Sequence, residues 1–351
     1  MKKILVGLQI IPAIALILLI GCEDSQTNAT EKENDSTSHA FTFYFDTLGE
    51  SSGSSLRDIT ILNDSLAFAV GEMFVRDSID TTKQTSNAIA KWNGKTWTTM
   101  KIYYNNNSLV SEILGIYVLN EKEIYLAAGS IYKWDGQSKN AELVFSRLSL
   151  PDPMATIYKL WGNSNNIYGI GQRGTLVFYN GSTWQQLNSG TVLQLNDIWG
   201  AVNPLNSEYE ILIAASDHAL NNGKMIIRIN SDQSTNQIID SGLNWENSGI
   251  WFVPNKKYYI AGDGIFLTNE IGMPWESAVN TTTFTTGVRG NNENDIFIAG
   301  IQMLLMHFNG ASWKKYFPDG NTHFARVAIK NDFMIAVGYS GAKAIVCRGY
   351  R

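Results

Sequence analysis

Residues 157–187, IYKLWGNSNNIYGIGQRGTLVFYNGSTWQQL, decide the fold. Turn-forming residues divide this stretch into four short apolar runs, at 157–161, 167–171, 175–179 and 184–187. The turn before the last run contains Asn180-Gly181, and both residue types tolerate the positive φ that a tight hairpin requires. The stretch therefore predicts four short strands in antiparallel hairpin order.

The same unit recurs along the chain. Its second run ends in a small residue at Gly71, Gly129, Gly171, Ala215, Gly262, Gly300 and Gly338, with spacings of 58, 42, 44, 47, 38 and 38 residues. An aromatic residue, Asn or Asp, and Gly end the third run in four repeats, and a tryptophan follows at Trp97, Trp184 and Trp313. A period near forty with four strands per repeat is typical of β-propeller blades, which cannot bury their faces alone. We predict an all-β, seven-bladed propeller of four-stranded antiparallel blades over residues 41–351.

The two ends of this region complement each other. The apolar segment 41–45, FTFYF, has no partner strands beside it in sequence, and the last repeat, 324–351, has only three strands. We predict that the N-terminal strand completes the last blade. Such closure would remove an exposed strand edge, which otherwise invites aggregation.

The N-terminal segment resembles a bacterial lipoprotein signal. A positively charged start precedes an apolar core over residues 4–20, and the lipobox-like Leu19-Ile20-Gly21-Cys22 closes it. The resemblance implies that residues 1–21 are a signal peptide, that Cys22 is lipidated, and that the mature chain is held at a membrane of the bacterial cell envelope. The alternative is an uncleaved transmembrane helix, for which the core is near the lower length limit.

Residues 22–40 are polar and acidic, so burial cannot offset their ordering entropy, and we predict a flexible tether. Glu23 and Asp24 resemble a surface-export signal of some outer-membrane lipoproteins. We therefore expect the outer membrane or the cell surface rather than the inner membrane. The alternative is an ordinary solvated linker.

Composition excludes several function classes. The net charge is −5 with no basic stripe, which disfavours nucleic-acid binding. No HExxH, CxxC, GxSxG or P-loop pattern occurs, so neither a metal nor a cofactor is predicted. The four histidines are expected at scattered places: His39 in the tether, His218 and His323 in loops, and His307 on a surface strand position. Cys347, the cysteine besides Cys22, is predicted to be a small buried hydrophobe.

The turns NGKTW, NGSTW and NGASW, at 93–97, 180–184 and 309–313, resemble the Asp-box S-x-D-x-G-x-T-W of sialidases and related propellers. The glycine and tryptophan match, whereas the serine and aspartate do not. The repeat is also similar to photosystem-assembly-type propellers and to uncharacterised bacterial secreted repeats. The resemblance covers about residues 56–351 and implies the fold; Asp-boxes are folding elements, so it implies no catalysis.

A sialidase-like enzyme would, by that resemblance, need three arginines around one carboxylate. Arg57, Arg289 and Arg326 fall on the first strands of blades 1, 6 and 7, which are neighbours in a closed ring. Their register spreads them over three residues, roughly 10 Å along the strands. We therefore prefer ordinary polar contacts between blades and keep a glycan-active enzyme as the alternative.

One position on each first strand directly precedes a buried apolar residue, and we call this set the channel column: Asp58, Gly115, Lys159, Asp197, Gly249, Gly287 and Arg326. Lys159 and Asp197 lie on adjacent blades, as do Arg326 and Asp58 after closure. The column therefore predicts ion pairs around a central channel. Their role is structural, or they form a polar funnel for a ligand.

These observations predict a membrane-anchored, non-catalytic binding or scaffold module for an envelope protein or glycan. The loop 72–87 connects a second strand to a third strand, and 103–112 connects two blades. Both kinds of connection lie on the same face of the ring. We expect binding on this face, near Asp58, Lys159, Asp197 and Arg326. The opposite face carries short turns, with 203–210 as the exception.

Overall fold

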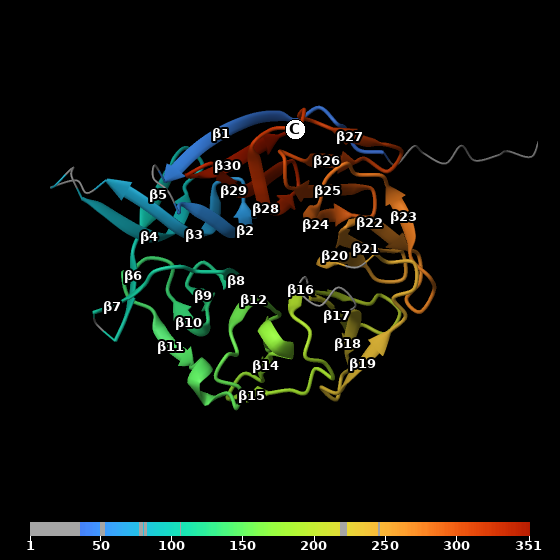
Figure 1. The fold of residues 1–351 in the computed structure, drawn as a ribbon, viewed down its shortest axis with the longest axis horizontal. Coiled ribbons are helices and arrows are strands. Elements are labelled where there is room, and N and C mark those ends of the chain that lie inside the picture. The colour runs from blue at the N-terminus through green and yellow to red at the C-terminus, as the bar shows by residue number, and fades with distance from the viewer. Residues whose placement is uncertain are drawn as a thin grey trace, which may run out of the picture. The chain divides into compact units, whose positions relative to one another are not determined.

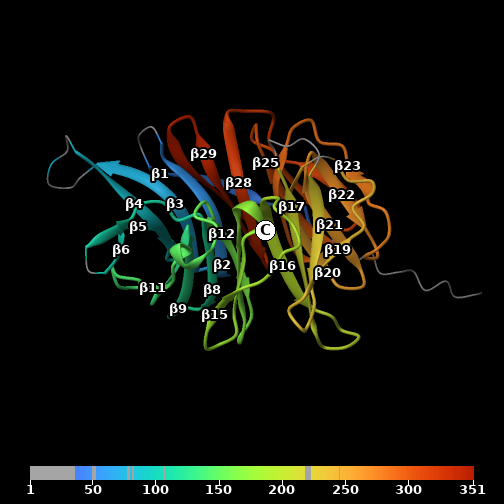
Figure 2. The same cartoon turned by 60° about the horizontal axis from the view of Figure 1, so that its bottom comes forward.

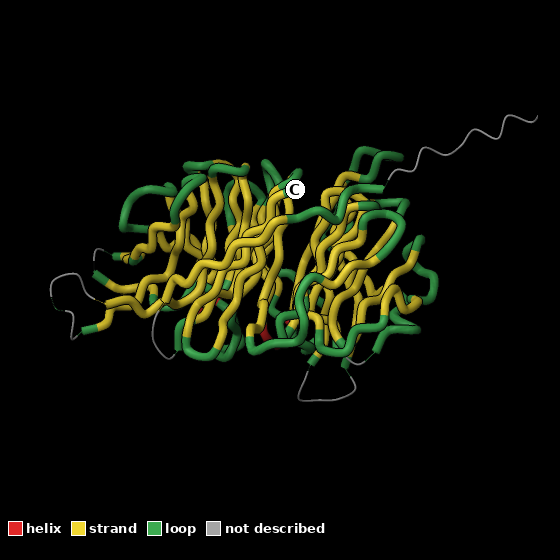
Figure 3. The backbone as a smooth tube through the Cα atoms, turned by 90° about the horizontal axis from the view of Figure 1, so that it is seen from above, coloured by secondary structure: helices red, strands yellow, loops and turns green. Residues whose placement is uncertain are grey.

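A computed structural model describes residues 36–49, 53–76, 80, 83–105, 107–217, 223–244 and 246–351. These residues form seven four-stranded antiparallel sheets arranged as a ring (Figure 1). Apart from two short 3₁₀ turns, the described secondary structure is all strand (Figure 3). The predicted seven-bladed propeller is confirmed.

Each blade runs from its first strand at the ring's centre to its fourth at the rim (Figure 1), and Figure 2 shows the blades obliquely. The strands are, for blade 1, β2 (Ser55–Asn63), β3 (Leu66–Arg76), β4 (Gln84–Trp92) and β5 (Trp97–Met100); for blade 2, β8 (Gly115–Asn120), β9 (Glu123–Ala128), β10 (Ser130–Trp134) and β11 (Glu142–Phe145); for blade 3, β12 (Ile157–Gly162), β13 (Ile167–Gly171), β14 (Leu176–Tyr179) and β15 (Trp184–Gln186); for blade 4, β16 (Leu195–Val202), β17 (Tyr209–Ser216), β18 (Lys224–Ile229) and β19 (Thr235–Ile238); for blade 5, β20 (Asn247–Val253), β21 (Lys257–Gly262), β22 (Gly264–Thr268) and β23 (Glu276–Val279); for blade 6, β24 (Thr285–Asn292), β25 (Asp295–Gly300), β26 (Leu305–Phe308) and β27 (Trp313–Lys315); and for blade 7, β28 (Thr322–Lys330), β29 (Phe333–Ser340), β30 (Lys343–Tyr350) and β1 (Thr42–Gly49).

The Asn-Gly turns form as the sequence predicts. Asn180 Oδ1 accepts hydrogen bonds from the amides of Ser182 (3.0 Å) and Thr183 (2.9 Å), and the following glycine has φ +89°. The turn sets Tyr179 opposite Trp184, with ring centroids 5.1 Å apart. The same cross-strand aromatic pairs recur as Trp92–Trp97 and Phe308–Trp313, so the turn chemistry fixes the third hairpin in each of these blades.

The small residue that ends the second strand makes room for the first strand. A Cβ on Gly171 would lie 1.7 Å from the carbonyl oxygen of Thr156. At this point the first strand shifts register by one residue in six blades and leaves one residue outside the ladder. We call these the bulge residues: Arg57, Tyr158, Asn196, Ser248, Thr286 and Ala325.

Blade 7 is closed by the N-terminal strand. β1 pairs antiparallel with β30, from Thr42 opposite Tyr350 to Gly49 opposite Ala344 (Figure 1). Arg348 binds the carboxylate of Asp46 through Nε (2.5 Å) and Nη2 (3.2 Å). The predicted closure is confirmed.

Two loops differ from their expected form. The loop expected over residues 72–87 is largely a hairpin, because the β3–β4 ladder continues to Arg76 opposite Gln84. The connection expected over 103–112 contains a second small hairpin, β6 (Ile102–Tyr104) with β7 (Ser108–Val110). Backbone pairing thus extends well into both segments. No helix of the described residues is long and apolar enough to cross a membrane.

The predicted surface position of His307 is wrong, since its side chain is 0% exposed. Residues 36–41, which directly precede β1, cover it. His39 Nδ1 lies 2.9 Å from His307 Nδ1, Phe41 packs edge-on against the same ring, and His307 Nε2 lies 2.8 Å from Asp295 Oδ1. In the tautomer of His307 that carries its proton on Nε2, Nε2 donates to Asp295 and Nδ1 accepts a hydrogen bond from His39 Nδ1. Cys347 is buried as predicted.

This histidine pair predicts a pH-dependent contribution to stability. Burial, then the neighbouring His307 and Lys314, lower the pKa of His39 below its ordinary value of 6.5. The contribution is therefore fully present above pH 6.5 and is lost as the pH falls below it, because the unfolded chain binds the proton more readily. We expect the denaturant concentration at the unfolding midpoint to be lower at pH 5 than at pH 7.5. This decrease should be smaller in His39→Gln. An equal fall in that variant would contradict the assignment.

Candidate functional site

The channel column carries a buried ion pair between blades 1 and 3. Lys159 Nζ lies 2.7 Å from Asp58 Oδ1, and both residues are buried. Asp58 Oδ2 accepts a further hydrogen bond, 3.1 Å, from the amide of Ile116 in blade 2. Burial lowers the pKa of Lys159, and Asp58 opposes that effect. The pair thereby ties three consecutive blades together.

A second pair repeats this arrangement between blades 4 and 6. Arg289 binds Asp197 with two parallel hydrogen bonds of 2.9 Å, and the amide of Ile250 in blade 5 donates to Asp197 Oδ2 at 3.0 Å. Burial raises the pKa of Asp197, but Arg289 and Lys159 outweigh it and hold the pKa at about 2. Asp197 is therefore ionised at neutral pH.

The predicted pairing between adjacent blades is wrong. Lys159 pairs with Asp58 rather than Asp197, and no hydrogen bond joins Arg326 to Asp58 among the described residues. In both observed pairs the blade between the partners carries a glycine in the column. A Cβ on Gly115 would lie 2.4 Å from the carbonyl oxygen of Tyr158, so glycine lets the neighbouring first strands approach closely there. The two charged side chains therefore meet across the glycine blade.

Arg326 is the cation of the column that forms neither of these two ion pairs. Its Nη1 donates to the carbonyl oxygens of Thr286 (2.8 Å) and Ala325 (2.9 Å), and Nη2 reaches the carbonyl oxygen of Asn196 at 3.4 Å. In the part of the chain that the structure describes, no carboxylate forms a salt bridge with Arg326. Its guanidinium is anchored by backbone alone.

A cavity of about 510 Å³, which we call the mouth cavity, lies over Arg326. Five blades contribute first-strand residues to it, and a sixth contributes Leu114, which directly precedes β8, so the cavity spans the centre of the ring. Its size is within the range of small-ligand sites. Three lining residues, Gln172, Ile301 and Tyr339, lie where second strands turn into third strands, which is the face that we predicted for binding. The lining residues are Arg57, Leu114, Tyr158, Gln172, Gln194, Asn196, Thr286, Ile301, His323, Phe324, Ala325, Arg326 and Tyr339.

The bulge residues supply much of this lining, and most of their polar groups bind the next blade. Asn196 Nδ2 donates to the carbonyl oxygen of Asn247 (2.8 Å), and Thr286 Oγ1 donates to that of Phe324 (2.7 Å). Tyr158 is different. Its hydroxyl is buried, has no partner of good hydrogen-bond geometry among the described residues, and has Gln194 beside it.

A smaller cavity of about 180 Å³, the floor cavity, lies further along the first strands, and its charged lining residues are Asp58, Lys159, Arg289, Arg326 and Lys330. Arg326 lines both cavities. The three arginines that a sialidase-like site would require are divided. Arg57 lies at the mouth and pairs with Glu112 (2.8 Å), whereas Arg289 lies at the floor and is held by Asp197.

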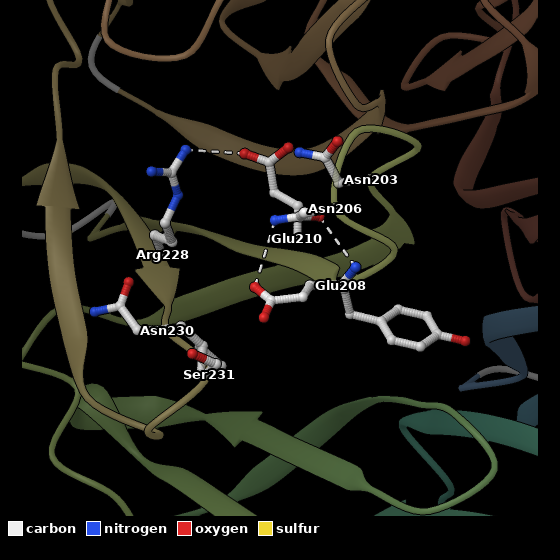
Figure 4. A pocket seen from close by; sticks show the side chains of 9 residues that line it. Asn203, Asn206, Glu208, Glu210, Arg228, Asn230 and Ser231 are labelled. Atoms are coloured by element: carbon white, nitrogen blue, oxygen red, sulfur yellow. Dashed lines mark hydrogen bonds and ion pairs between the residues drawn. The ribbon is translucent and has the colours of Figure 1, made fainter.

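The opposite face has a cavity of about 260 Å³ between the β16–β17 and β18–β19 turns (Figure 4). Arg228 Nη2 lies 2.9 Å from Glu210 Oε1, the neighbouring Tyr258 hydroxyl donates to Glu210 Oε2 (2.9 Å), and the buried Arg228 Nε has no hydrogen-bond partner among the described residues. Asn206 Oδ1 accepts from the amide of Glu208 (3.0 Å). This cavity provides a matched control for the mouth cavity.

Of the column residues predicted from sequence, Arg326 lines the mouth cavity, whereas the mouth residues Tyr158, Asn196 and His323 were not predicted. All three could have been found. Tyr158 and Asn196 directly precede the column positions Lys159 and Asp197, and the bulge at the start of these two first strands sends the preceding residue to the mouth. His323, expected in a loop, lies on β28 at the start of its blade. Its ring stacks on Tyr339 at 5.1 Å. No group of residues in the described ranges could hold a metal ion.

Searches found no matching family model and no matching curated protein. Solved structures do match. YCF48 bound to D1 peptide is 14% identical with a TM-score of 0.64 over 88% of this chain and 97% of that one. U3-55K is 11% identical with a TM-score of 0.62 over 88% and 98%, and the WD40 propeller domain of Doa1 is 14% identical with a TM-score of 0.62 over 88% and 97%. At these identities the likeness shows the β-propeller fold, which this chain shares.

Proposed function

We propose that this chain is a non-catalytic binding or scaffold propeller that holds a segment of a partner protein in the mouth cavity. The observation that carries the proposal is a cavity of about 510 Å³ at the centre of a rigid ring, lined from six blades. Two ion-paired cross-links between blades stiffen the strands beneath it. A rigid scaffold with a concave polar and aromatic centre suits recognition.

The comparisons favour a protein segment over a glycan as the ligand. One neighbour in fold was solved with a bound peptide, and another is a WD40 domain. A glycan-active enzyme remains the alternative from a different class. It has less support, because Arg57 and Arg289 line separate cavities.

We further propose that the propeller is lipid-anchored at the bacterial cell envelope, on the outer membrane or cell surface. The support is the sequence alone, Leu19-Ile20-Gly21-Cys22 after an apolar core, and these residues lie outside the described ranges. Cys22→Ser should move the chain from the membrane fraction to the soluble fraction, since acylation is lost. Unchanged membrane partitioning with an intact N-terminus would instead support a transmembrane helix.

Site-specific photo-crosslinking tests the binding face. A benzophenone amino acid would replace exposed Gln172 or Gln194 at the mouth, or exposed Asn206 at the opposite-face cavity, in cells that express the full chain. We expect a discrete protein adduct from the two mouth positions and none from position 206. Adducts from position 206 alone would place binding on the opposite face. Lys159→Ala is unsuitable as a test, because it would leave Asp58 buried without its partner.

A further inference from the structure

We infer that the mouth cavity recognises one carboxylate group of a peptide, held by Arg326 and by the hydroxyl of Tyr158. This inference rests on the proposed function and specifies the chemistry of its ligand. Both residues line the mouth cavity, and each has a polar group for which no hydrogen-bond partner is found among the described residues.

The orientation of Arg326 leaves one edge of its guanidinium for a ligand. Both protons of Nη1 are used by the carbonyl oxygens of Thr286 and Ala325. No described group accepts from Nε, and Nη2 makes one long contact of 3.4 Å to Asn196. Nε and Nη2 form the side edge of the guanidinium, which binds a carboxylate through two parallel hydrogen bonds. The backbone contacts therefore hold the fork in place before a ligand arrives.

The charges of the column point to the same group. Lys159 pairs with Asp58, and Arg289, which lies outside the column, pairs with Asp197, so each carboxylate of the column has one cation and Arg326 is left without a carboxylate among the described residues. Each carboxylate is already bound by its own cation and by a backbone amide. Arg326 lies at the boundary of the mouth and floor cavities. A single negative charge in the mouth would balance its charge.

Tyr158 can add a third hydrogen bond. Asn196, Ser248 and Thr286, at equivalent positions, each donate to a carbonyl oxygen of the next blade. The Tyr158 hydroxyl has no such carbonyl partner among the described residues, and the Gln194 side chain beside it does not reach good hydrogen-bond geometry, so a ligand acceptor would satisfy the hydroxyl better. Burial raises the pKa of Tyr158 above the ordinary value, although Arg326 and Gln194 oppose the rise, so the hydroxyl stays protonated and can donate.

The lining also argues against a phosphate group. The other cation among the described lining residues is Arg57, which is half-exposed and already bound to Glu112 at 2.8 Å. A doubly charged group would lack a second cation without a carboxylate partner among the described lining residues. A carboxylate, with one charge and a planar pair of oxygens, matches the one fork that Arg326 presents.

The test is affinity selection with the full chain purified in mild detergent. Three random octapeptide mixtures serve as probes: one with a free C-terminus and no Asp or Glu, one amidated with a single Asp or Glu, and one amidated without either. We expect retention of one or both carboxylate-bearing mixtures to exceed that of the uncharged mixture about ten- to hundredfold. The first two arms distinguish a terminal carboxylate from a side-chain carboxylate.

Variants assign the effect to the site. Arg326→Gln should abolish the preference, Arg326→Lys should restore only part of it because the fork is lost, and Tyr158→Phe should weaken retention severalfold. Arg173→Gln is the matched control, since Arg173 is an exposed arginine on the same face outside the cavity, paired with Asp152. Thermal unfolding of each variant checks that the ring is intact.

Two outcomes would overturn the inference, and they are distinguishable. If the uncharged mixture is retained equally and Arg326→Gln and Arg326→Lys both bind like the parent, recognition of a carboxylate is wrong while peptide binding stands. If no mixture is retained and mouth crosslinks are absent, the proposed function fails with it.

Discussion

A chain that begins at Ser51 is expected to unfold at least about 10 °C below one that begins at Glu23. It lacks β1, so β30 loses its partner strand and blade 7 presents an unpaired edge. It also loses Phe41 and Phe43, which pack on Phe297 and on Tyr316 and Phe317, respectively. Burying each aromatic side chain stabilises by about 1.5–3 kcal/mol. For a domain of this size each kcal/mol shifts the melting temperature by about 2–4 °C.

Calorimetry on the two chains measures the difference, with a chain that begins at Ser36 as control. The control should melt like the longer chain, because it keeps the strand and the His39 contact. A synthetic peptide of residues 36–49, added to the chain that begins at Ser51, should raise its melting temperature by restoring the missing strand. Equal melting temperatures for the chains that begin at Glu23 and Ser51 would show that closure contributes little.

Arg289→Met is expected to destabilise the ring by about 3–5 kcal/mol, because it leaves a buried carboxylate without its bidentate partner. Asp197 is 0% exposed and keeps one hydrogen bond, from the amide of Ile250. Lys159 also acts on Asp197 but is already bound to Asp58. Arg57→Met is the matched control, since its exposed pair with Glu112 should contribute less than about 1 kcal/mol.

The pH dependence identifies the cause. In the parent chain the pKa of Asp197 is lowered from 3.8 to about 2, so its contribution is present above pH 3.8 and is lost as the pH falls towards 2. In Arg289→Met the buried Asp197 carboxyl is expected to favour its neutral form. Acidification should therefore reduce the difference in unfolding free energy between this variant and the parent. Adding Asp197→Asn should recover part of the loss at neutral pH. Chemical denaturation measures both effects, and a loss no larger than that of Arg57→Met would refute the assignment.

Local sequence determined the blades. Asn180-Gly181 and its equivalents form the expected turns because Asn side chains bind the next amides and Gly accepts positive φ. The small residue at the end of each second strand predicted the repeat. A small residue is needed there because the backbone of the first strand approaches closely. Closure by the segment 41–45 also followed from sequence, because a three-stranded last blade needs one more partner.

The three-dimensional arrangement alone decided the site. The sequence predicted that Asp58, Lys159, Asp197 and Arg326 lie in one column. Which of them form ion pairs depends on the blades that have glycine in the column, because charged side chains from the two flanking blades meet there. His307 is buried because a segment more than 260 residues away covers it. Strand period and turn chemistry act between neighbours in sequence, whereas burial and ion pairing depend on distances that only the closed ring sets. That is why the sequence predicted the propeller. Only the structure showed that, among the described residues, Arg326 has no carboxylate partner and the Tyr158 hydroxyl has no hydrogen-bond partner of good geometry.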